Sequence, residues 1–466
     1  MNEFFKRMKY FLVFIAIYSS AAVAQDTTRI SLLFAGDIMG HDSQIASAFD
    51  PETKTYNYAS CFEHMRPYLE SADIAFGNLE VTLAGPPYKG YPQFSSPDEL
   101  AVALKDVGFD VLVTSNNHSV DHRRRGIERT IRVLDSLGIP HTGTFFDEVS
   151  RLNEYPLILD KNGFTLALLN YTYGTNGIPV PEPGMVNLID TAQIRKDIYK
   201  AKQVRPDAII AFMHWGIEYE SLPSASQKQL TEFCFDQGAD LVIGSHPHVL
   251  QPMEWRKDKN KFVVYSLGNF VSGQRKQYTD GGTMAYLELQ KVRHTPDSIV
   301  ASIDSAGYFL QWVYRTEDQH KDYYMVPVPG FEQNPATLVK GSASVQAFRR
   351  FVKDSRELYG KHNLNVPEVA TTPPDSVVRY KIHIALHNED TSKQGATLTP
   401  LPDYYFYGAT MIHEGEGREG LALGDFRDQA FANRLCARLN ESGQQARVVR
   451  YLNGKVSPQS PVTSSQ

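Results

Sequence analysis

Six short polar clusters lie within the first 270 residues, and all but the last carry side chains suited to metal binding or acid–base chemistry. They are Gly36-Asp37-Ile38-Met39, Gly77-Asn78-Leu79-Glu80, Asn116-Asn117-His118-Ser119-Val120-Asp121, His214-Trp215-Gly216, His246-Pro247-His248 and Leu267-Gly268-Asn269-Phe270. Carboxylate, amide and imidazole groups are ligands for divalent metal ions. Gathered around an open position, they would hold a metal that activates water or polarises a phosphoryl oxygen.

The donors best suited to such a metal are spread over four of these clusters. They are the carboxylate of Asp37, the amide oxygen of Asn117 and the imidazoles of His214, His246 and His248. Pro247 presets the turn between the last two, so both rings can face one ion. Taken alone, this pair could equally be two surface histidines in a turn. Because four other clusters precede it, we favour the metal.

His118 and Glu80 are the candidates for acid–base chemistry. Asp121 follows His118 by three residues and could bond the far ring nitrogen, which suits a general acid or an oxyanion stabiliser. The alternative is a helix-capping Asn117 beside an incidental histidine. Glu80 could be a metal ligand, a general base or a salt-bridge partner, and we favour a role in the site.

Further polar residues near the clusters each allow two interpretations. Tyr219 could bond a substrate oxygen or be structural, and Asn269 could touch substrate or cap the end of a strand. His41 and Asp42 could line the pocket, but we interpret them as loop residues.

Apolar, β-prone runs must position these side chains. Each of the first five clusters directly follows one such run, at residues 30–35, 73–76, 111–114, 208–213 and 241–244. Helix-like stretches alternate with the runs, at residues 97–107, 126–137, 191–203 and 226–237. This alternation predicts a layered α/β domain, in which the carboxyl ends of neighbouring strands converge on one crevice. Alternating patterns at residues 284–289 and 308–314 predict antiparallel strands that complete the sheets.

The remaining chain divides into further regions. We predict a large domain over residues 25–335, a helix and linker over 336–375, and a small α+β domain over 376–456. The helix should span residues 344–359. The small domain should contain strands at 380–386, 404–408 and 446–452 and a helix at 426–442. The Ser/Pro/Gln-rich tail at 457–466 is predicted to be disordered.

The N-terminus has the pattern of a signal peptide over residues 1–24. Lys6, Arg7 and Lys9 precede an apolar core at residues 10–18, and Ala22-Val23-Ala24 provides a cleavage pattern. The core is shorter than the about 20 residues of a membrane span, so we favour cleavage and export over an uncleaved anchor. The three cysteines are too few and too far apart for a disulfide framework, and we expect them to be buried.

Charge gives no case for nucleic-acid binding. The chain of 466 residues has 47 Lys and Arg against 53 Asp and Glu, for a net charge of -6, whereas nucleic-acid partners usually require a basic surface. Arg123-Arg124-Arg125 is a local exception, which we interpret as the solvated start of a helix.

The six clusters, taken together, resemble the CapA-type poly-γ-glutamate (capsule) synthesis proteins, a family similar in fold to calcineurin-like metallophosphoesterases. The matching motifs cover about residues 30–290 in the family's order and include the extended forms His214-Trp215-Gly216-Ile217-Glu218-Tyr219 and Tyr265-Ser266-Leu267-Gly268-Asn269-Phe270. The resemblance implies a four-layer α/β/β/α sandwich. It also implies a role outside the cytoplasm, in the periplasm or cell envelope, on an anionic envelope polymer or its precursor, together with other envelope synthesis or export proteins.

The resemblance also assigns roles to single residues. Asp37 would match the first metal aspartate, Asn78 the position near the bridging aspartate and Asn117 the metal asparagine. His118 would match the catalytic histidine, and His214, His246 and His248 the metal histidines. Met39 and the neutral Asn78 depart from the phosphoesterase pattern, where a histidine and a carboxylate are usual. The implied cofactor is one or two ions of Mn, Fe, Zn or Mg, or none, and the alternative to an enzyme is a binding scaffold that keeps the fold.

The C-terminal unit resembles a SPOR-type domain through Tyr380-Lys381-Ile382-His383-Ile384 and Leu423-Gly424-Asp425-Phe426, which leads into the predicted helix. That resemblance implies binding to the glycan strands of peptidoglycan. The alternative is a generic accessory domain.

Overall fold

The computed structural model describes residues 27–295, 298–318, 320–369, 378–385, 410–414, 418–426, 429–441, 445–452 and 455–456. The predicted signal peptide at 1–24, the predicted strand at 404–408 and the predicted disordered tail at 457–466 lie outside these residues. Within the described ranges, no helix is both long enough and apolar enough to span a bilayer.

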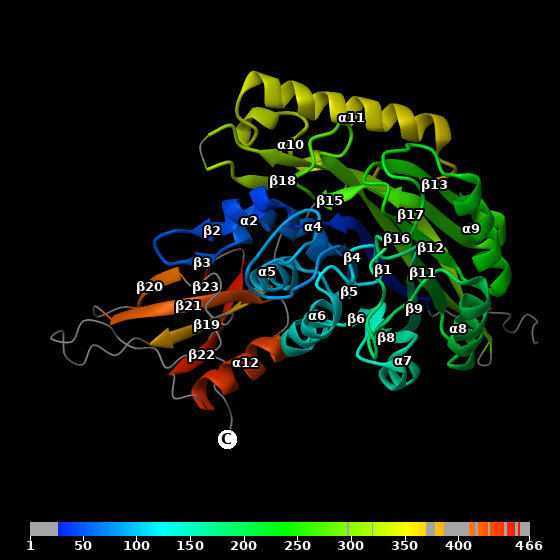
Figure 1. The fold of residues 1–466 in the computed structure, drawn as a ribbon, viewed down its shortest axis with the longest axis horizontal. Helices are drawn as coiled ribbons and strands as arrows, with labels where there is room; N and C mark the ends of the chain where they lie inside the picture. Colours follow the sequence, from blue (N-terminus) through cyan, green and yellow to red (C-terminus); the bar gives the residue numbers. More distant parts are fainter. Residues whose placement is uncertain are drawn as a thin grey trace, which may run out of the picture.

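The first of two large sheets contains the strands that end in the first three clusters and in the last one (Figure 1). Its order is β18 (Tyr323–Pro327), β17 (Ser298–Arg315), β16 (Gly281–Thr295), β1 (Thr27–Ile38), β4 (Ile74–Leu79), β5 (Val111–Val113) and β6 (His141–Thr142), with β15 (Asn269–Val271) also paired to β1. Strands β1, β4, β5 and β6 are parallel, while β16, β17 and β18 continue the sheet in antiparallel fashion. The predicted antiparallel strands at 284–289 and 308–314 are thus confirmed.

The second sheet contains the strands that end in the two histidine clusters. Its order is β13 (Leu250–Arg256), β14 (Lys261–Leu267), β12 (Leu241–Ser245), β11 (Ala208–His214), β9 (Phe164–Thr172) and β8 (Leu157–Lys161). The four central strands are parallel and the two edge strands are antiparallel to their neighbours.

The two sheets pack face to face, with helices on both outer faces. Side chains alternate along each strand, so one face of β1 (Leu32, Phe34) belongs to the same buried cluster as Leu168 and Phe212 of the second sheet. The opposite face of β1 packs in a separate cluster with residues of the helices α4 (Arg66–Ser71), α5 (Glu99–Val107) and α6 (Arg123–Leu137). Helices α8 (Thr191–Gln203) and α9 (Ala225–Gln237) cover the second sheet. The predicted four-layer α/β/β/α sandwich is therefore confirmed.

Shorter elements connect these layers. They are α2 (Asp42–Ala48), β2 (Phe49–Asp50), β3 (Thr55–Tyr56), α3 (Ala59–Phe62), β7 (Thr144–Phe145), α7 (Glu148–Glu154), β10 (Met185–Val186) and α10 (Val328–Phe331), with 3-10 turns at Glu63–Met65, Lys257–Lys259 and Pro335–Thr337. Helix α6 begins at Arg123, so the arginine triplet forms a helix start as predicted. The three cysteines are free and buried, also as predicted.

Helix α11 (Ser342–His362) lies across the large domain (Figure 1). Its Phe348, Phe351 and Val352 join the cluster between the sheets. The chain beyond the helix bridges back to the sheets through Leu364 and Glu368. The packed unit therefore extends to about residue 369.

In its described residues, the C-terminal unit has a five-stranded antiparallel sheet and one helix. The strand order is β20 (Thr410–Glu414), β21 (Arg418–Phe426), β19 (Val378–Ala385), β22 (Ala446–Leu452) and β23 (Lys455–Val456). Helix α12 (Gln429–Glu441) packs on this sheet with Ala432 and Leu439 buried. Strands β20 and β21 were not predicted, because residues 418–426 combine charges and glycines without the alternation of a strand.

The backbone at Gly36 passes so close to the next strand that no side chain fits. A Cβ atom there would overlap the carbonyl oxygen of Gly268, which accepts a hydrogen bond from Asp37 N at 3.0 Å. We expect Gly36→Ala to lower the free energy of unfolding by about 1–3 kcal/mol or more, because the two strands would have to separate. Urea denaturation would measure the loss.

Gly360→Ala is the matched control for this prediction. Gly360 is an exposed residue within α11, and a Cβ there would meet nothing within 4 Å. This substitution should instead stabilise the protein by roughly 0.5–1 kcal/mol. Equal stabilities of the two variants would contradict the close approach at Gly36.

Candidate metal site

The predicted ligands meet where the carboxyl ends of the parallel strands of both sheets lie together. Asp37 is the penultimate residue of β1 and is the register partner of Asn78 in β4 and of Asn269 in β15. His214 ends β11 and is the partner of Ser245, the last residue of β12. Parallel pairing therefore brings residues that are far apart in the sequence to one edge.

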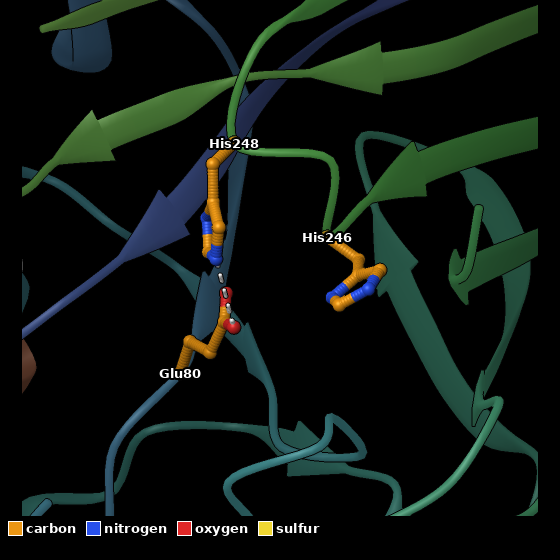
Figure 2. A group of neighbouring side chains, drawn as sticks. All are labelled: Glu80, His246 and His248. Carbon is orange, nitrogen blue, oxygen red and sulfur yellow. Dashed lines mark ion pairs between the residues drawn. The ribbon is translucent and has the colours of Figure 1, made fainter. Parts of the chain in front are cut away.

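Glu80 is at the centre of two groups of potential metal ligands. Donor atoms of Glu80, His246 and His248 lie within 4.8 Å of one another, and so do those of Asp37, Glu80 and His214. Figure 2 shows the His248 ring directed at the Glu80 carboxylate, with Nε2 3.8 Å from Oε1, and His246 beside them. The same oxygen lies 3.5 Å from His214 Nε2. One glutamate oxygen thus faces imidazoles from two strand ends.

Asn78 and Asn117 contact the same side chains. Asn78 Nδ2 donates to Asp37 Oδ1 at 2.8 Å and lies 3.4 Å from Glu80 Oε2 and 3.3 Å from His214 Nδ1. Asn117 Oδ1 lies 2.8 Å from His214 Nε2. The six predicted ligands, together with Glu80, therefore form one connected cluster.

The turn between His246 and His248 has an unusual backbone. His246 has φ 100° and His248 has φ 58°, both in the left-handed region that costs energy for residues other than glycine. His246 N donates to Asp37 Oδ2 at 3.2 Å, and His248 Nδ1 lies 3.2 Å from the same oxygen. Asp37 thus holds the strained turn against the end of β1.

Burial makes this cluster costly without a cation. Asp37 and Glu80 are fully buried, and none of the described lysines or arginines pairs with either carboxylate. Burial, reinforced by the charge of Asp37, raises the pKa of Glu80 well above its usual range. Burial also lowers the pKa of His214 and brings that of His246 to about 3.

Two buried atoms of the cluster lack any hydrogen-bond partner. They are Glu80 Oε1 and His246 Nδ1. Native proteins rarely leave such atoms unpaired, and an ion not seen in a structure is one of the usual reasons. Carboxylate oxygens and neutral imidazoles are ligands that Mn²⁺, Fe²⁺ and Zn²⁺ accept. The residues present therefore fit a divalent metal ion.

His118 lies beside this cluster and is paired with Asp121. Its Nδ1 is 2.7 Å from Asp121 Oδ2, which also accepts from Phe94 N at 2.7 Å. The edge of the Phe94 ring packs on the His118 ring, with centroids 4.6 Å apart. These contacts fix the ring and leave Nε2 as the atom that can meet a substrate. Its backbone N donates to Asn116 Oδ1 at 3.1 Å, and Asn116 Nδ2 donates to Asn78 Oδ1 at 3.3 Å, which links His118 to the cluster.

The two residues predicted to contact substrate both lie near His248. Asn269 Oδ1 is 3.0 Å from His248 Nδ1, and its Nδ2 donates to Gln274 and to the carbonyl of Thr279. Both polar atoms of the Asn269 amide therefore contact other protein groups, and the side chain orients the His248 imidazole. The Tyr219 ring lies 6.3 Å from the His248 ring and is partly exposed.

Sequence reasoning overlooked Tyr173. It follows β9, is 48% exposed and places its ring 4.6 Å from that of His246. Its position directly after a strand was the available signal, but no histidine or carboxylate closely follows β9 to draw attention to it.

The sequence favours His41 as a loop residue, but in the structure its side chain lies close to the site. Its ring packs edge-on against Phe94 at 5.2 Å, and its Nδ1 accepts from Gly273 N at 3.1 Å. Burial, with smaller contributions from His248 and His118, lowers its pKa to about 4. Met39, by contrast, is buried in the core on the helix side of the first sheet.

Comparison with known proteins gives consistent matches over the large domain. The family described as "Bacterial capsule synthesis protein PGA_cap" matches residues 31–274. The capsule biosynthesis protein CapA of Bacillus anthracis is 30% identical over 266 residues, covering 54% of this chain and 61% of that protein. The PGA biosynthesis protein CapA of Bacillus subtilis is 29% identical over 273 residues, covering 56% of this chain and 68% of that protein. The chain thus spans less than two thirds of the length of the Bacillus anthracis relative.

Two solved structures match part of the chain at low similarity. A hypothetical protein from Thermus thermophilus has a TM-score of 0.32 and 14% identity, covering 59% of this chain and 98% of its own. A novel phosphatase from Mycoplasma pneumoniae has a TM-score of 0.31 and 14% identity, covering 59% and 94%. The fold assignment rests on the sheets and their packing.

Proposed function

Because the chain belongs to the family of bacterial capsule synthesis proteins, we propose that it is an exported protein of the periplasm or cell envelope. It acts there on an anionic polymer or a polymer precursor through a divalent-metal site. The observation that carries this proposal is the buried group around Glu80, with two carboxylates, three imidazoles and two unpaired polar atoms. Purely structural clusters of buried charge are normally neutralised by a paired cation.

Each residue has a distinct part in this proposal. Asp37, Glu80, His214, His246 and His248 would hold the metal, with the amide oxygen of Asn117 as a further ligand and Asn78 donating through Nδ2 to Asp37 Oδ1. A divalent ion at such a site polarises a phosphoryl or acyl oxygen. His118, oriented by Asp121, would donate a proton to the leaving group.

Metal analysis of the purified full chain tests the proposal. We expect stoichiometric Mn, Fe or Zn and metal-dependent cleavage of a model phosphodiester, both lost in His246→Ala. His320→Ala is the control, because His320 is an exposed side chain whose ion pair is with Asp322. A metal-free wild type that is also inactive after loading with each ion would overturn the proposal.

A second candidate, a scaffold that binds polymer without turnover, is favoured by one contact. The Asn78 amide nitrogen contacts Asp37, Glu80 and His214, so it links three would-be ligands as a neutral donor. Such a scaffold would retain polymer without metal and would show no metal-dependent turnover.

For the C-terminal unit, we propose binding to peptidoglycan in the manner of a SPOR-type domain. Its antiparallel sheet backed by one helix is compatible with that assignment. Purified sacculi should pull down the full chain more strongly than a chain ending at residue 369. Equal recovery would leave the unit as an accessory domain.

The contact between Asn269 and His248 gives a further prediction. Side chains that orient a metal-binding histidine typically affect metal affinity by about 10–100-fold. We therefore expect Asn269→Ala to weaken metal binding by about that factor, as measured by competition with a chromogenic chelator. An unchanged affinity would mean that His248 is not a ligand.

A further inference from the structure

Lys276 places a positive charge beside the metal site. Its Nζ lies 3.7 Å from the centroid of the Tyr219 ring. That ring is in turn 6.3 Å from the ring of His248. Tyr219 is itself fixed, because its backbone N donates to Pro247 O at 2.8 Å within the histidine turn. The ammonium is thus held over an aromatic face next to a proposed metal ligand.

The loop that carries Lys276 is tied to the same histidine by a second route. This loop, residues 272–280, joins β15 to β16. Asn269, which binds His248 Nδ1, donates to Gln274 Oε1 at 2.9 Å and to Thr279 O at 2.8 Å. Thr279 N and Oγ1 both donate to Lys276 O, at 3.0 and 2.8 Å. The backbone of Lys276 therefore has a fixed position relative to His248.

The charge of Lys276 has no carboxylate partner among the described residues. Other lysines do have one: Lys261 pairs with Asp240 and Lys291 with Asp207. A ring face attracts an ammonium but leaves its charge uncompensated, and the N–H groups turned away from the ring remain able to donate. An exposed lysine held in this way at the edge of a ligand-binding site is suited to an anion.

We propose that Lys276 is a specificity-determining residue that binds a carboxylate or phosphate group of the substrate, adjacent to the group held at the metal. The inference rests on the proposed function, since it concerns recognition at the same site. Tyr219 acts through Lys276 as a positioning residue. Binding would depend on charge, and therefore on salt.

Three probes test this inference on the metal-loaded full chain. They are a fluorescent γ-linked glutamate decamer, its neutral γ-linked glutamine counterpart, and inorganic phosphate as a competitor of the first. We expect the wild type to prefer the glutamate decamer, and Lys276→Met to bind it about fivefold or more weakly with a smaller dependence on salt. Lys276→Arg should restore the affinity. Weaker competition by phosphate in Lys276→Met would assign the site to phosphate as well as carboxylate.

Lys259→Met is the matched control, because Lys259 is exposed near the start of β14, at the edge of the sheet opposite the site. It should bind the decamer as the wild type does. Equal loss of decamer affinity in both variants, or no loss in Lys276→Met, would overturn the inference. The proposed function would still stand if the protein keeps its metal and its turnover. A wild type that binds metal but does not distinguish the two decamers would overturn it too.

Discussion

Glu80→Gln is expected to stabilise the metal-free protein by about 1–3 kcal/mol while lowering metal affinity by about 100-fold or more. Glu80 is fully buried beside Asp37, and its Oε1 has no hydrogen-bond partner. Burial raises its pKa strongly, which means that the folded protein disfavours the charged form. A glutamine keeps the shape and could donate to His248, whose Nε2 lies 3.8 Å from Oε1.

Two measurements on the same variant check this expectation. Thermal unfolding in a chelator reports the stability of the metal-free protein, and elemental analysis after reloading reports the metal. Asp121→Asn is the control for metal content. Asp121 is a buried carboxylate that pairs with His118, and it belongs to neither group of potential ligands. If Glu80→Gln destabilises the metal-free protein and keeps its metal, Glu80 is a structural residue.

In Glu80→Gln, the stability of the metal-free protein should rise while its metal affinity falls. Residues selected for a packed core contribute to stability, whereas residues selected for function often reduce it. Gly36→Ala tests the first class, because it disturbs the strands that position Asp37. Glu80→Gln tests the second, because the glutamate has an unfavourable environment until a cation is present.

The strand pattern explains how much of this site could be predicted. Asp37 and His214 end apolar runs that become β1 and β11, so strand length and chain direction were enough to bring them together. The arrangement of Glu80 was harder to predict. It lies one residue beyond β4, where its N donates to Ile38 O at 3.0 Å, and this contact fixes its direction. Contacts of this kind depend on register, which sequence spacing does not encode.

Other parts of the site depend on loops rather than strands. Lys276 and Tyr173 carry no metal-ligand chemistry, so no motif marks them. Their relation to the histidines arises from the loop over residues 272–280 and from the end of β9. In the C-terminal unit, the helix and the strand at 446–452 followed from apolar spacing, but β21 did not, because Gly420 and Gly424 interrupt its pattern.

Asn78→Asp is the second substitution with a large expected effect. Asn78 Nδ2 donates to Asp37 Oδ1 at 2.8 Å, while its Oδ1 accepts from Asn116 at 3.3 Å. The aspartate would replace the donor by an oxygen and bring a third carboxylate into the buried group. Without a compensating charge, we expect the metal-free protein to lose about 3–5 kcal/mol of stability. Added Mn²⁺ or Zn²⁺ should restore it, because ions that bind the folded state stabilise it.

Asn170→Asp separates this effect from ordinary loss of a buried amide. Asn170 is also fully buried, but its amide contacts backbone rather than the proposed ligands: Nδ2 donates to the carbonyl of Phe212 at 3.2 Å and Oδ1 accepts from Ser115 N at 2.7 Å. We expect Asn170→Asp to lower the stability of the protein, and added metal should not restore that stability. Recovery confined to Asn78→Asp, with more metal bound per chain than in the wild type, would show that the neutral amide at position 78 limits the number of ions. If the two variants behave alike, the binding scaffold without turnover is favoured. The Asn78 amide would then take the structural role that a cation has in the metal-binding alternative.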